Sequence, residues 1–341
     1  MFKSNKVKFA IGILISIVFL YLVFDQIDLR QAGEALQKAN YYYLLPATIF
    51  LFLSLWFRAY RWGIFFRPLK VMKLSNLFSA LMVGYMGNTI FPFKLGEILR
   101  AHSIGKVENF SKVASFATIV VERMLDLIFL LLLLGIALFF QSFDGYGIVK
   151  SGGFILFAVV VAGIIFLVFL IVKTDKTLLF YRRITSVFPA KLRDKGEKIL
   201  ISLLSGLLVI KKPEYYLAIA ISSIAIWLCY IATMIIFIYA FDLDEKYFNG
   251  DFAQITLASI TILIMSGLSV SIPASPGYVG TFHLFVMQAL IIYNVPNSQA
   301  FSFAVILHLF SMAPPAIMGM YYFFKQHISL KEALENKGVL E

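Results

Sequence analysis

The sequence GYMGNTIFPFKLGEILR, residues 84–100, interrupts a long apolar segment that begins near Leu74. The apolar pattern breaks at Asn88 and Pro92 and then continues over a short segment that carries charged side chains. Proline lacks a backbone N–H and its ring clashes with the preceding turn, so a continuous helix is disfavoured here. We therefore expect a broken helical hairpin over residues 74–112.

A second apolar segment is broken in the same way in the far half of the chain. Residues 255–271 are apolar, the sequence PASPG at residues 273–277 interrupts them, and the apolar pattern resumes at residues 278–293. Paired Gly/Pro-interrupted segments in the two halves of a membrane protein are typical of transporter sites. Their freed backbone groups are tolerated at membrane depth only when they are buried in protein or face a water-filled cavity. We expect a second hairpin over residues 252–293; two ordinary kinked spans are the alternative.

The composition identifies an integral membrane protein. Hydrophobic residues make up 60% of the 341 residues and charged residues 14%, against roughly 25% charged residues in ordinary globular domains. Long continuous apolar runs favour helices over a β-barrel. The formal net charge of +11 comes from basic residues between apolar runs, where the positive-inside rule explains them without nucleic acid. Nothing indicates a metal or another cofactor, since the four histidines lack ligand spacing and Cys229 is the single cysteine.

The loop charges predict the topology. A basic run that includes Arg58 and Arg61 accompanies the exit of a span and marks the cytoplasmic side, whereas the acidic loop at residues 242–251 marks the outside. We predict an all-α polytopic protein that forms a single transmembrane domain over residues 1–341. It has about six full transmembrane helices plus two oppositely oriented re-entrant hairpins in an inverted-repeat arrangement, with both termini in the cytoplasm. The six expected spans are residues 9–24, 41–60, 113–140, 154–172, 215–241 and 299–324.

The longest polar connection, residues 173–212, is strongly basic and is expected in the cytoplasm. Leucine and isoleucine recur at helical spacing between residues 199 and 208. We interpret this pattern as an amphipathic helix that lies on the membrane surface. A protein partner that binds residues 173–212 is the alternative interpretation.

Glu122 and Asp126 are carboxylates inside an expected span. An ionisable side chain in a span costs about 2.5–3.5 kcal/mol on insertion scales and therefore indicates function. The two are four residues apart and share a helix face, near mid-bilayer at about 1.5 Å per residue. Arg123 lies about 100° away around the helix, so we expect that it cannot pair with both carboxylates. Either the pair handles substrate or protons, or one carboxylate forms a structural salt bridge with Lys94 or Arg100.

Lys94, Glu97 and Arg100 form a second charged group directly after the first break. The half-helix that starts after Pro92 directs free backbone amides and the positive end of its dipole into the membrane interior. The half-helix after Pro276 does the same from the opposite side. These helix ends and the two cations suit a phosphate or another anionic headgroup; the alternative is that both cations snorkel to the inner surface.

Three motifs occur in order along the chain: Asn88-x3-Pro92-x-Lys94-x-Gly96-Glu97-x2-Arg100, Glu122-Arg123-x2-Asp126 and Pro276-Gly277-x2-Gly280. Together they resemble the flippase-like transmembrane domain of lysylphosphatidylglycerol synthases, and the resemblance covers nearly the whole chain. The chain departs from that family at Lys94, where arginine is common, and at His283, where glutamate often follows the last motif.

The resemblance implies lipid translocation. The soluble domain that transfers the amino acid in the synthases would follow the last helix, where about fifteen residues remain, so aminoacyl transfer is not expected. We expect a transporter rather than an enzyme, which moves an amphipathic anionic lipid or glycolipid between leaflets of the cytoplasmic membrane. The alternatives are a membrane-embedded transferase with one of the carboxylates as base, and a non-catalytic subunit of a lipid or glycan pathway. The candidate substrate-binding residues are Asn88, Pro92, Lys94, Glu97, Arg100, Glu122, Arg123, Asp126, Ser275, Pro276, Gly277, Gly280 and His283.

Overall fold

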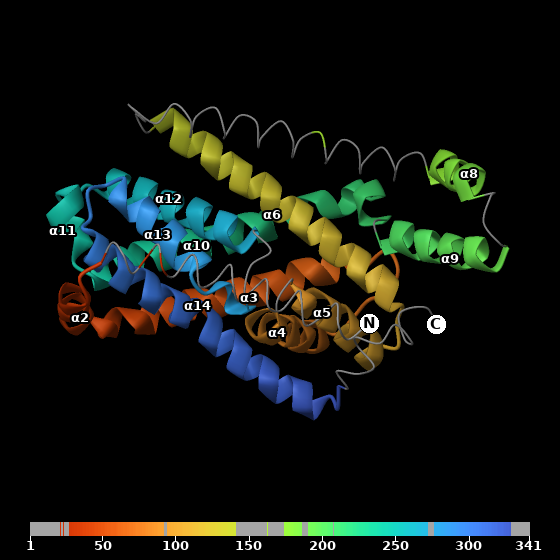
Figure 1. The fold of residues 1–341 in the computed structure, drawn as a ribbon. Coiled ribbons are helices and arrows are strands. Elements are labelled where there is room, and N and C mark those ends of the chain that lie inside the picture. The colour runs from red at the N-terminus through yellow and green to blue at the C-terminus, as the bar shows by residue number, and fades with distance from the viewer. Residues whose placement is uncertain are drawn as a thin grey trace.

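The computed structural model describes residues 27–91, 94–140, 174–185, 190–206, 208–271 and 276–328, together with Tyr21, Val23 and Ala162. Every regular element in these ranges is a helix, as the sequence predicts (Figure 1). The expected spans at residues 9–24 and 154–172 lie almost entirely outside the described residues, and so do the candidate site residues Pro92 and Ser275.

Among the described residues, five helices are long and apolar enough to cross a membrane, and the chain is a multi-pass membrane protein. Four of them coincide with expected spans: α3 (Leu44–Phe66), α6 (Lys112–Phe140), α10 (Tyr216–Ala240) and α14 (Asn297–Lys325). The fifth, α12 (Phe252–Ser271), is the first limb of the second expected hairpin. In a helix the backbone N–H and C=O groups bond to one another, which is required in a membrane because lipid tails offer them no hydrogen-bond partners.

The first break produces two short antiparallel helices, α4 (Leu74–Ile90) and α5 (Leu95–Val107). Gly87 faces Gly96 so closely that a Cβ on Gly87 would lie 2.6 Å from the Gly96 Cα. Small residues let two helix backbones approach in this way. Lys94 turns the chain with a left-handed backbone, φ 54°, directly before α5 begins.

Glu108 joins the two open ends of this hairpin. Its Oε1 accepts a hydrogen bond from Asn76 Nδ2 at 2.7 Å and one from the backbone N–H of Lys73 at 3.3 Å. Lys70 Nζ lies 3.2 Å from the other carboxylate oxygen. Partial burial raises the pKa of Glu108, but the bonds from Asn76, Lys70 and Lys73 outweigh it and hold this pKa below its ordinary value. The carboxylate therefore stays ionised and keeps the start of α4 beside the end of α5.

The second break gives a long first limb, α12, and a short returning limb, α13 (Thr281–Ile291), with one 3-10 turn, η5 (Pro276–Tyr278), between them. Thr261 of α12 hydrogen-bonds to Tyr293, just beyond α13, with 2.9 Å between the two hydroxyl oxygens. The Tyr293 ring centroid lies 5.4 Å from that of the last residue of α11 (Leu243–Phe248), which precedes α12. The second hairpin thus also begins and ends at one end of the molecule.

The two hairpins come from opposite ends of the molecule. The open end of the first lies beside the end of α14, where Lys106 Nζ donates to the His327 carbonyl oxygen at 2.6 Å. The second hairpin leads directly into the start of α14. Because α14 is a helix of 29 residues, about 44 Å long, its two ends are far apart. In Figure 1, α11 lies toward one end of the molecule and α9 (Ala190–Gly206) toward the other.

The tips of the hairpins meet between these ends. A Cβ on Gly277 of η5 would lie 3.3 Å from the carbonyl oxygen of Thr89, in the last turn of α4. Gly277 has φ 62°, a conformation that glycine adopts without strain and most other residues do not. The two interruptions in the sequence therefore become neighbours in space.

The basic connection forms two helices, α8 (Thr174–Ile184) and α9. Arg182 Nη2 lies 2.5 Å from Glu197 Oε1 and links them. The expected amphipathic helix corresponds to α9, which packs against the first turns of α6: a Cβ on Gly206 would overlap the Ala114 carbonyl oxygen. One end of α9 is therefore covered by protein.

Candidate functional site

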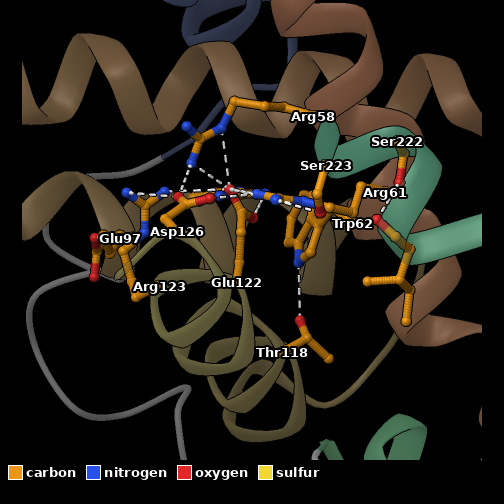
Figure 2. A network of polar contacts seen from close by, with 12 residues as sticks. Arg58, Arg61, Trp62, Glu97, Thr118, Glu122, Arg123, Asp126, Ser222 and Ser223 are labelled. Atoms are coloured by element: carbon orange, nitrogen blue, oxygen red, sulfur yellow. Dashed lines mark hydrogen bonds and ion pairs between the residues drawn. The ribbon is translucent and has the colours of Figure 1, made fainter. Parts of the chain in front are cut away.

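A cluster of charged side chains lies where α3, α5 and α6 meet (Figure 2). Two arginines come from α3, three residues apart, and the carboxylates of α6 are four residues apart, so each pair shares one helix face. We call this set the ionic cluster; its members are Arg58, Arg61, Glu97, Arg100, Glu122, Arg123 and Asp126.

Glu122 lies at the centre of the ionic cluster and its side chain is fully buried. Arg58 Nη2 lies 2.5 Å from its Oε1, and Arg100 Nη2 lies 2.6 Å from its Oε2. The Arg100 guanidinium also stacks 3.7 Å above the ring of Trp62, whose Nε1 donates to Thr118 at 2.8 Å. One carboxylate thus links α3, α5 and α6, and the salt bridge between Arg100 and Glu122 is the structural role that the sequence left open.

Asp126 forms the second centre of the cluster. Arg61 Nη2 lies 2.6 Å from its Oδ1 and Arg58 Nη2 lies 2.8 Å from its Oδ2. Both arginines have neutral partners on α10 as well: Arg58 Nη1 donates to the Tyr230 hydroxyl and Arg61 Nη1 to Ser223 Oγ, each at 3.0 Å. All three nitrogens of the Arg58 guanidinium and both terminal nitrogens of Arg61 therefore have acceptors, as buried charge requires, whereas Arg61 Nε has none among the described residues.

The positions of Arg58 and Arg61 correct the sequence interpretation, which assigns them to the basic exit of a span that ends at residue 60. Helix α3 continues to Phe66, and the two side chains are 6% and 0% exposed. They can be buried because Glu122 and Asp126 neutralise them. Their spacing was the available signal: two cations three apart on one helix match two carboxylates four apart on another.

Arg123 also corrects an expectation, because it does contact both carboxylates. Its Nη2 lies 3.2 Å from Glu122 Oε1 and its Nη1 lies 3.5 Å from Asp126 Oδ2. The prediction was wrong because it considered the direction of the side chain at the backbone and not the reach of a long, forked guanidinium. Arg123 Nε also lies 3.5 Å from Glu97 Oε1 of α5. Figure 2 shows Arg123 and Glu97 on one side of the cluster and Ser223 on the other.

A cavity of about 540 Å³ borders the exposed side of the cluster. Its wall is partly charged and partly apolar. The apolar part comes from α3, α6, α10, α12, α13 and α14, with Leu51, Leu127, Trp227, Leu263, Phe282 and Met312 among its members. The charged residues in the wall are Arg58, Lys94, Glu97, Arg123 and Asp126. This lining suits a molecule that carries both a charged group and hydrocarbon.

A smaller cavity of about 90 Å³ adjoins the first and lies between the tips of the hairpins. Asn88, Arg100 and Tyr278 line it. Lys94, Glu97 and Arg123 line both cavities. The Lys94 ammonium makes no close ion pair or hydrogen bond with any residue that the structure describes, and the Arg123 side chain is 38% exposed. Lys94 and Arg123 are thus less buried than Arg58, Arg61 and Arg100 and are the members of this group that a ligand in the cavities can reach.

The second break reaches the cavities through residues near the candidates, since Gly277, Gly280 and His283 line neither cavity. Phe282 lines the larger cavity and Tyr278 the smaller one. His283 Nδ1 accepts a hydrogen bond from the Gly280 N–H at 3.3 Å, and its ring lies 4.8 Å from that of His308. His308 Nε2 lies 2.7 Å from the Gly277 carbonyl oxygen, to which it donates. The two histidines therefore hold the second tip in shape. Within the described ranges, no three His, Cys, Asp or Glu side chains are grouped as a metal site would need.

Comparison with protein families gives one match that covers most of the chain. The model of the family described as Lysylphosphatidylglycerol synthase TM region matches residues 9–319. No solved structure matches the chain.

Curated relatives are membrane proteins and one named transferase. A UPF0104 membrane protein of Methanothermobacter thermautotrophicus is 35% identical over 144 residues, which cover 40% of this chain and 43% of that protein. A UPF0104 membrane protein of Methanocaldococcus jannaschii is 26% identical over 255 residues, 73% of this chain and 98% of that protein. Glycosyltransferase AglD of Haloferax volcanii is 22% identical over 364 residues, 98% of this chain and 57% of that protein. The matches thus span less than half of the first relative and a little over half of the third.

Proposed function

Because the chain belongs to the lysylphosphatidylglycerol synthase transmembrane-region family, we propose that it moves an amphipathic, anionic lipid between the two leaflets of the cytoplasmic membrane. One observation carries the proposal: the tips of two hairpins from opposite ends of the molecule meet at a cavity with accessible cations and an apolar wall. A lipid that changes leaflet needs both surfaces at mid-depth, since its headgroup must leave water while its tails stay in hydrocarbon.

In this proposal the two hairpins are re-entrant and form an inverted pair. The end of the molecule that holds the open first hairpin is rich in lysine and arginine, which supports a cytoplasmic position for this end by the positive-inside rule. Among the described residues, the charged side chains at this end include Arg67, Lys70, Lys73, Lys106, Glu108, Lys112 and Lys325. The opposite end is mainly acidic, with Asp28, Arg30, Glu34, Lys38, Asp242, Asp244, Glu245, Lys246 and Asp251. Both termini are then cytoplasmic.

The charged residues divide into two groups with different roles. Lys94 and Arg123 line both cavities and bind the anionic headgroup directly. Arg58, Arg61 and Glu122 are at most 7% exposed and hold α3, α5 and α6 in register. This division supports a site in which fewer residues contact the headgroup than the sequence indicates. Arg100 and Asp126 lie between the two groups.

The second break supplies the opposite wall of the path. Gly277 and Gly280 adopt positive φ angles, and His283 caps the start of α13. We assign these residues, with Pro276, to shaping the tip against which the headgroup moves. Asn88 lines the smaller cavity from the first tip and is assigned to the headgroup as well.

The similarity to Glycosyltransferase AglD over 98% of the chain favours a second candidate, a membrane component of a lipid glycosylation pathway. A role as the transferase itself is less well supported by the geometry. Both oxygens of Glu122 are engaged by arginines and its side chain is fully buried, so it is a poor candidate for a base that must reach substrate. The basic helices α8 and α9 offer a docking surface for a partner protein in this second candidate.

The two candidates are separated by supplying one labelled anionic lipid in two settings. A flippase leaves the lipid chemically unchanged in detergent and moves it only when two leaflets exist. We expect unchanged lipid by mass spectrometry in detergent and leaflet exchange in reconstituted vesicles. Unchanged lipid in detergent together with no exchange in vesicles would replace the proposed function with the second candidate. A lipid that is chemically altered in detergent when a sugar donor is added would indicate the transferase.

A further inference from the structure

The charges around the two cavities do not balance. The ionic cluster and Lys94 together hold five cations, Arg58, Arg61, Lys94, Arg100 and Arg123, against three carboxylates, Glu97, Glu122 and Asp126. The formal charge of this set is therefore +2. The two positive charges in excess are divided between two groups. Arg58, Arg61 and Arg100 exceed the carboxylates Glu122 and Asp126 by one charge. Lys94 and Arg123 exceed Glu97 by one charge.

Surplus charge is costly where water is scarce, because a low-dielectric surrounding leaves it without compensation. A bound headgroup with two negative charges removes the surplus. A phosphodiester, with one negative charge, leaves the site at +1, and a zwitterionic headgroup leaves it at +2. Charge complementarity thus ranks the ligands in the order dianion, monoanion, zwitterion.

The smaller cavity has the size and donors for the end of such a headgroup. Its volume of about 90 Å³ is several times the roughly 10–15 Å³ that a cavity needs to hold one water, which is room for one phosphate group. Lys94, Arg100 and Arg123 all line it. The Arg100 side chain is 3% exposed, and its Nε has no hydrogen-bond partner among the described residues. Guanidinium groups bind phosphate oxygens through charge-assisted hydrogen bonds.

We propose that the site recognises a dianionic phosphate group, as a terminal phosphomonoester or a diphosphate, with this phosphate in the smaller cavity and the adjoining part of the lipid in the larger one. The inference rests on the proposed function, because it specifies the headgroup of the lipid that is moved. Lys94, Arg100 and Arg123 bind the phosphate group in this proposal, and Glu97 positions the Arg123 side chain through their ion pair.

The test compares three lipids with matched acyl chains on the purified full chain in detergent: phosphatidic acid, phosphatidylglycerol and phosphatidylcholine. We expect phosphatidic acid to bind at least tenfold more tightly than phosphatidylglycerol at pH 8. The second ionisation of a phosphomonoester has a pKa of about 6, so this preference should shrink at pH 5. Phosphatidylglycerol keeps one charge over this range and should serve as the internal control.

A charge variant tests the same point from the protein side. Lys94→Met lowers the site to +1, so the preference for phosphatidic acid should fall severalfold while phosphatidylglycerol changes less. Lys325→Met is the matched control, because Lys325 is exposed at the end of α14 and lines neither cavity. Thermal melting of both variants checks that they are folded.

Three results would contradict the proposal, and they distinguish failure of the dianion from failure of the proposed function. Equal binding of phosphatidic acid and phosphatidylglycerol, with loss of both in Lys94→Met, would overturn the dianion and leave the proposed function standing. No preference for either anionic lipid over phosphatidylcholine would overturn both. Inorganic phosphate or pyrophosphate that competes at the same concentration as phosphatidic acid would assign the site to a soluble anion and contradict the lipid.

Discussion

At the scale of single residues, Glu122 determines how three helices meet. Its two oxygens contact arginines from α3 and α5, and it is itself part of α6. Removal of one partner from a buried ion pair typically costs about 3–5 kcal/mol, because the remaining charge stays buried without compensation. Glu97 is different: it is partly exposed and its contact with Arg123 is longer, at 3.5 Å. Replacement of Glu122 and replacement of Glu97 should therefore have different effects.

Glu122→Gln should lower the melting temperature and the yield of folded protein, since Arg58 and Arg100 lose their shared counter-charge. Glu97→Gln, the matched variant, should keep its melting temperature near that of the wild type and reduce lipid exchange instead. The measurement is thermal melting in detergent together with exchange in vesicles. A Glu122→Gln variant that melts like the wild type would show that the carboxylate is not the structural centre proposed here.

The sequence identifies part of this site and misses another part for a physical reason. Glu122 and Asp126 stand out because carboxylates are rare in an apolar span. Arg58 and Arg61 do not stand out, because they precede Arg67 and Lys70 and blend into a basic exit. Which arginine pairs with which carboxylate depends on how α3 approaches α6, and no local pattern specifies that approach. Trp62 and Tyr230 are missed for the same reason.

At the scale of elements, each break in the sequence separates two helices, and the tightness with which α4 and α5 pack depends on contacts between glycines that no periodicity reveals. Gly96 packs against α4 so closely that a Cβ there would overlap the Gly84 carbonyl oxygen. This contact brings Lys94 and Glu97 beside the cavities. The end of α3 was predicted six residues too early, because buried arginines resemble the exit of a span.

Gly96→Ala should separate α4 from α5, since the clash is with backbone and no side chain can move aside. We expect a lower melting temperature and loss of lipid exchange. Gly135→Ala is the matched control: Gly135 lies in α6, and a Cβ added there would meet nothing within 4 Å, so the variant should be unchanged or up to about 1 kcal/mol more stable. Equal melting of the two variants would contradict the close packing of the first hairpin.

At the scale of the whole molecule, the hairpins and the unequal charge of the two ends predict one topology. Single cysteines at Lys73 and Lys106, in a Cys229→Ala background, flank the first hairpin and should react with an impermeant thiol reagent from the cytoplasmic side. Cysteines at Phe252 and Asn294 flank the second and should react from the outside only. All four positions are exposed. Reaction of Lys73→Cys and Lys106→Cys from opposite sides would mean that the first hairpin crosses the membrane.

In the proposed mechanism, a lipid headgroup passes between the hairpin tips in contact with Lys94 and Arg123. The decisive measurement is the exchange of a labelled anionic lipid between the leaflets of reconstituted vesicles. Each cation contributes a charge-assisted hydrogen bond, so its loss should weaken headgroup binding by about 1.5–3 kcal/mol, or roughly ten- to hundredfold. We expect Lys94→Gln and Arg123→Gln to slow exchange at least tenfold when the lipid concentration is too low to saturate the site. Lys325→Gln should match the wild type. Wild-type exchange in both cavity variants, with folding verified by melting, would contradict this mechanism.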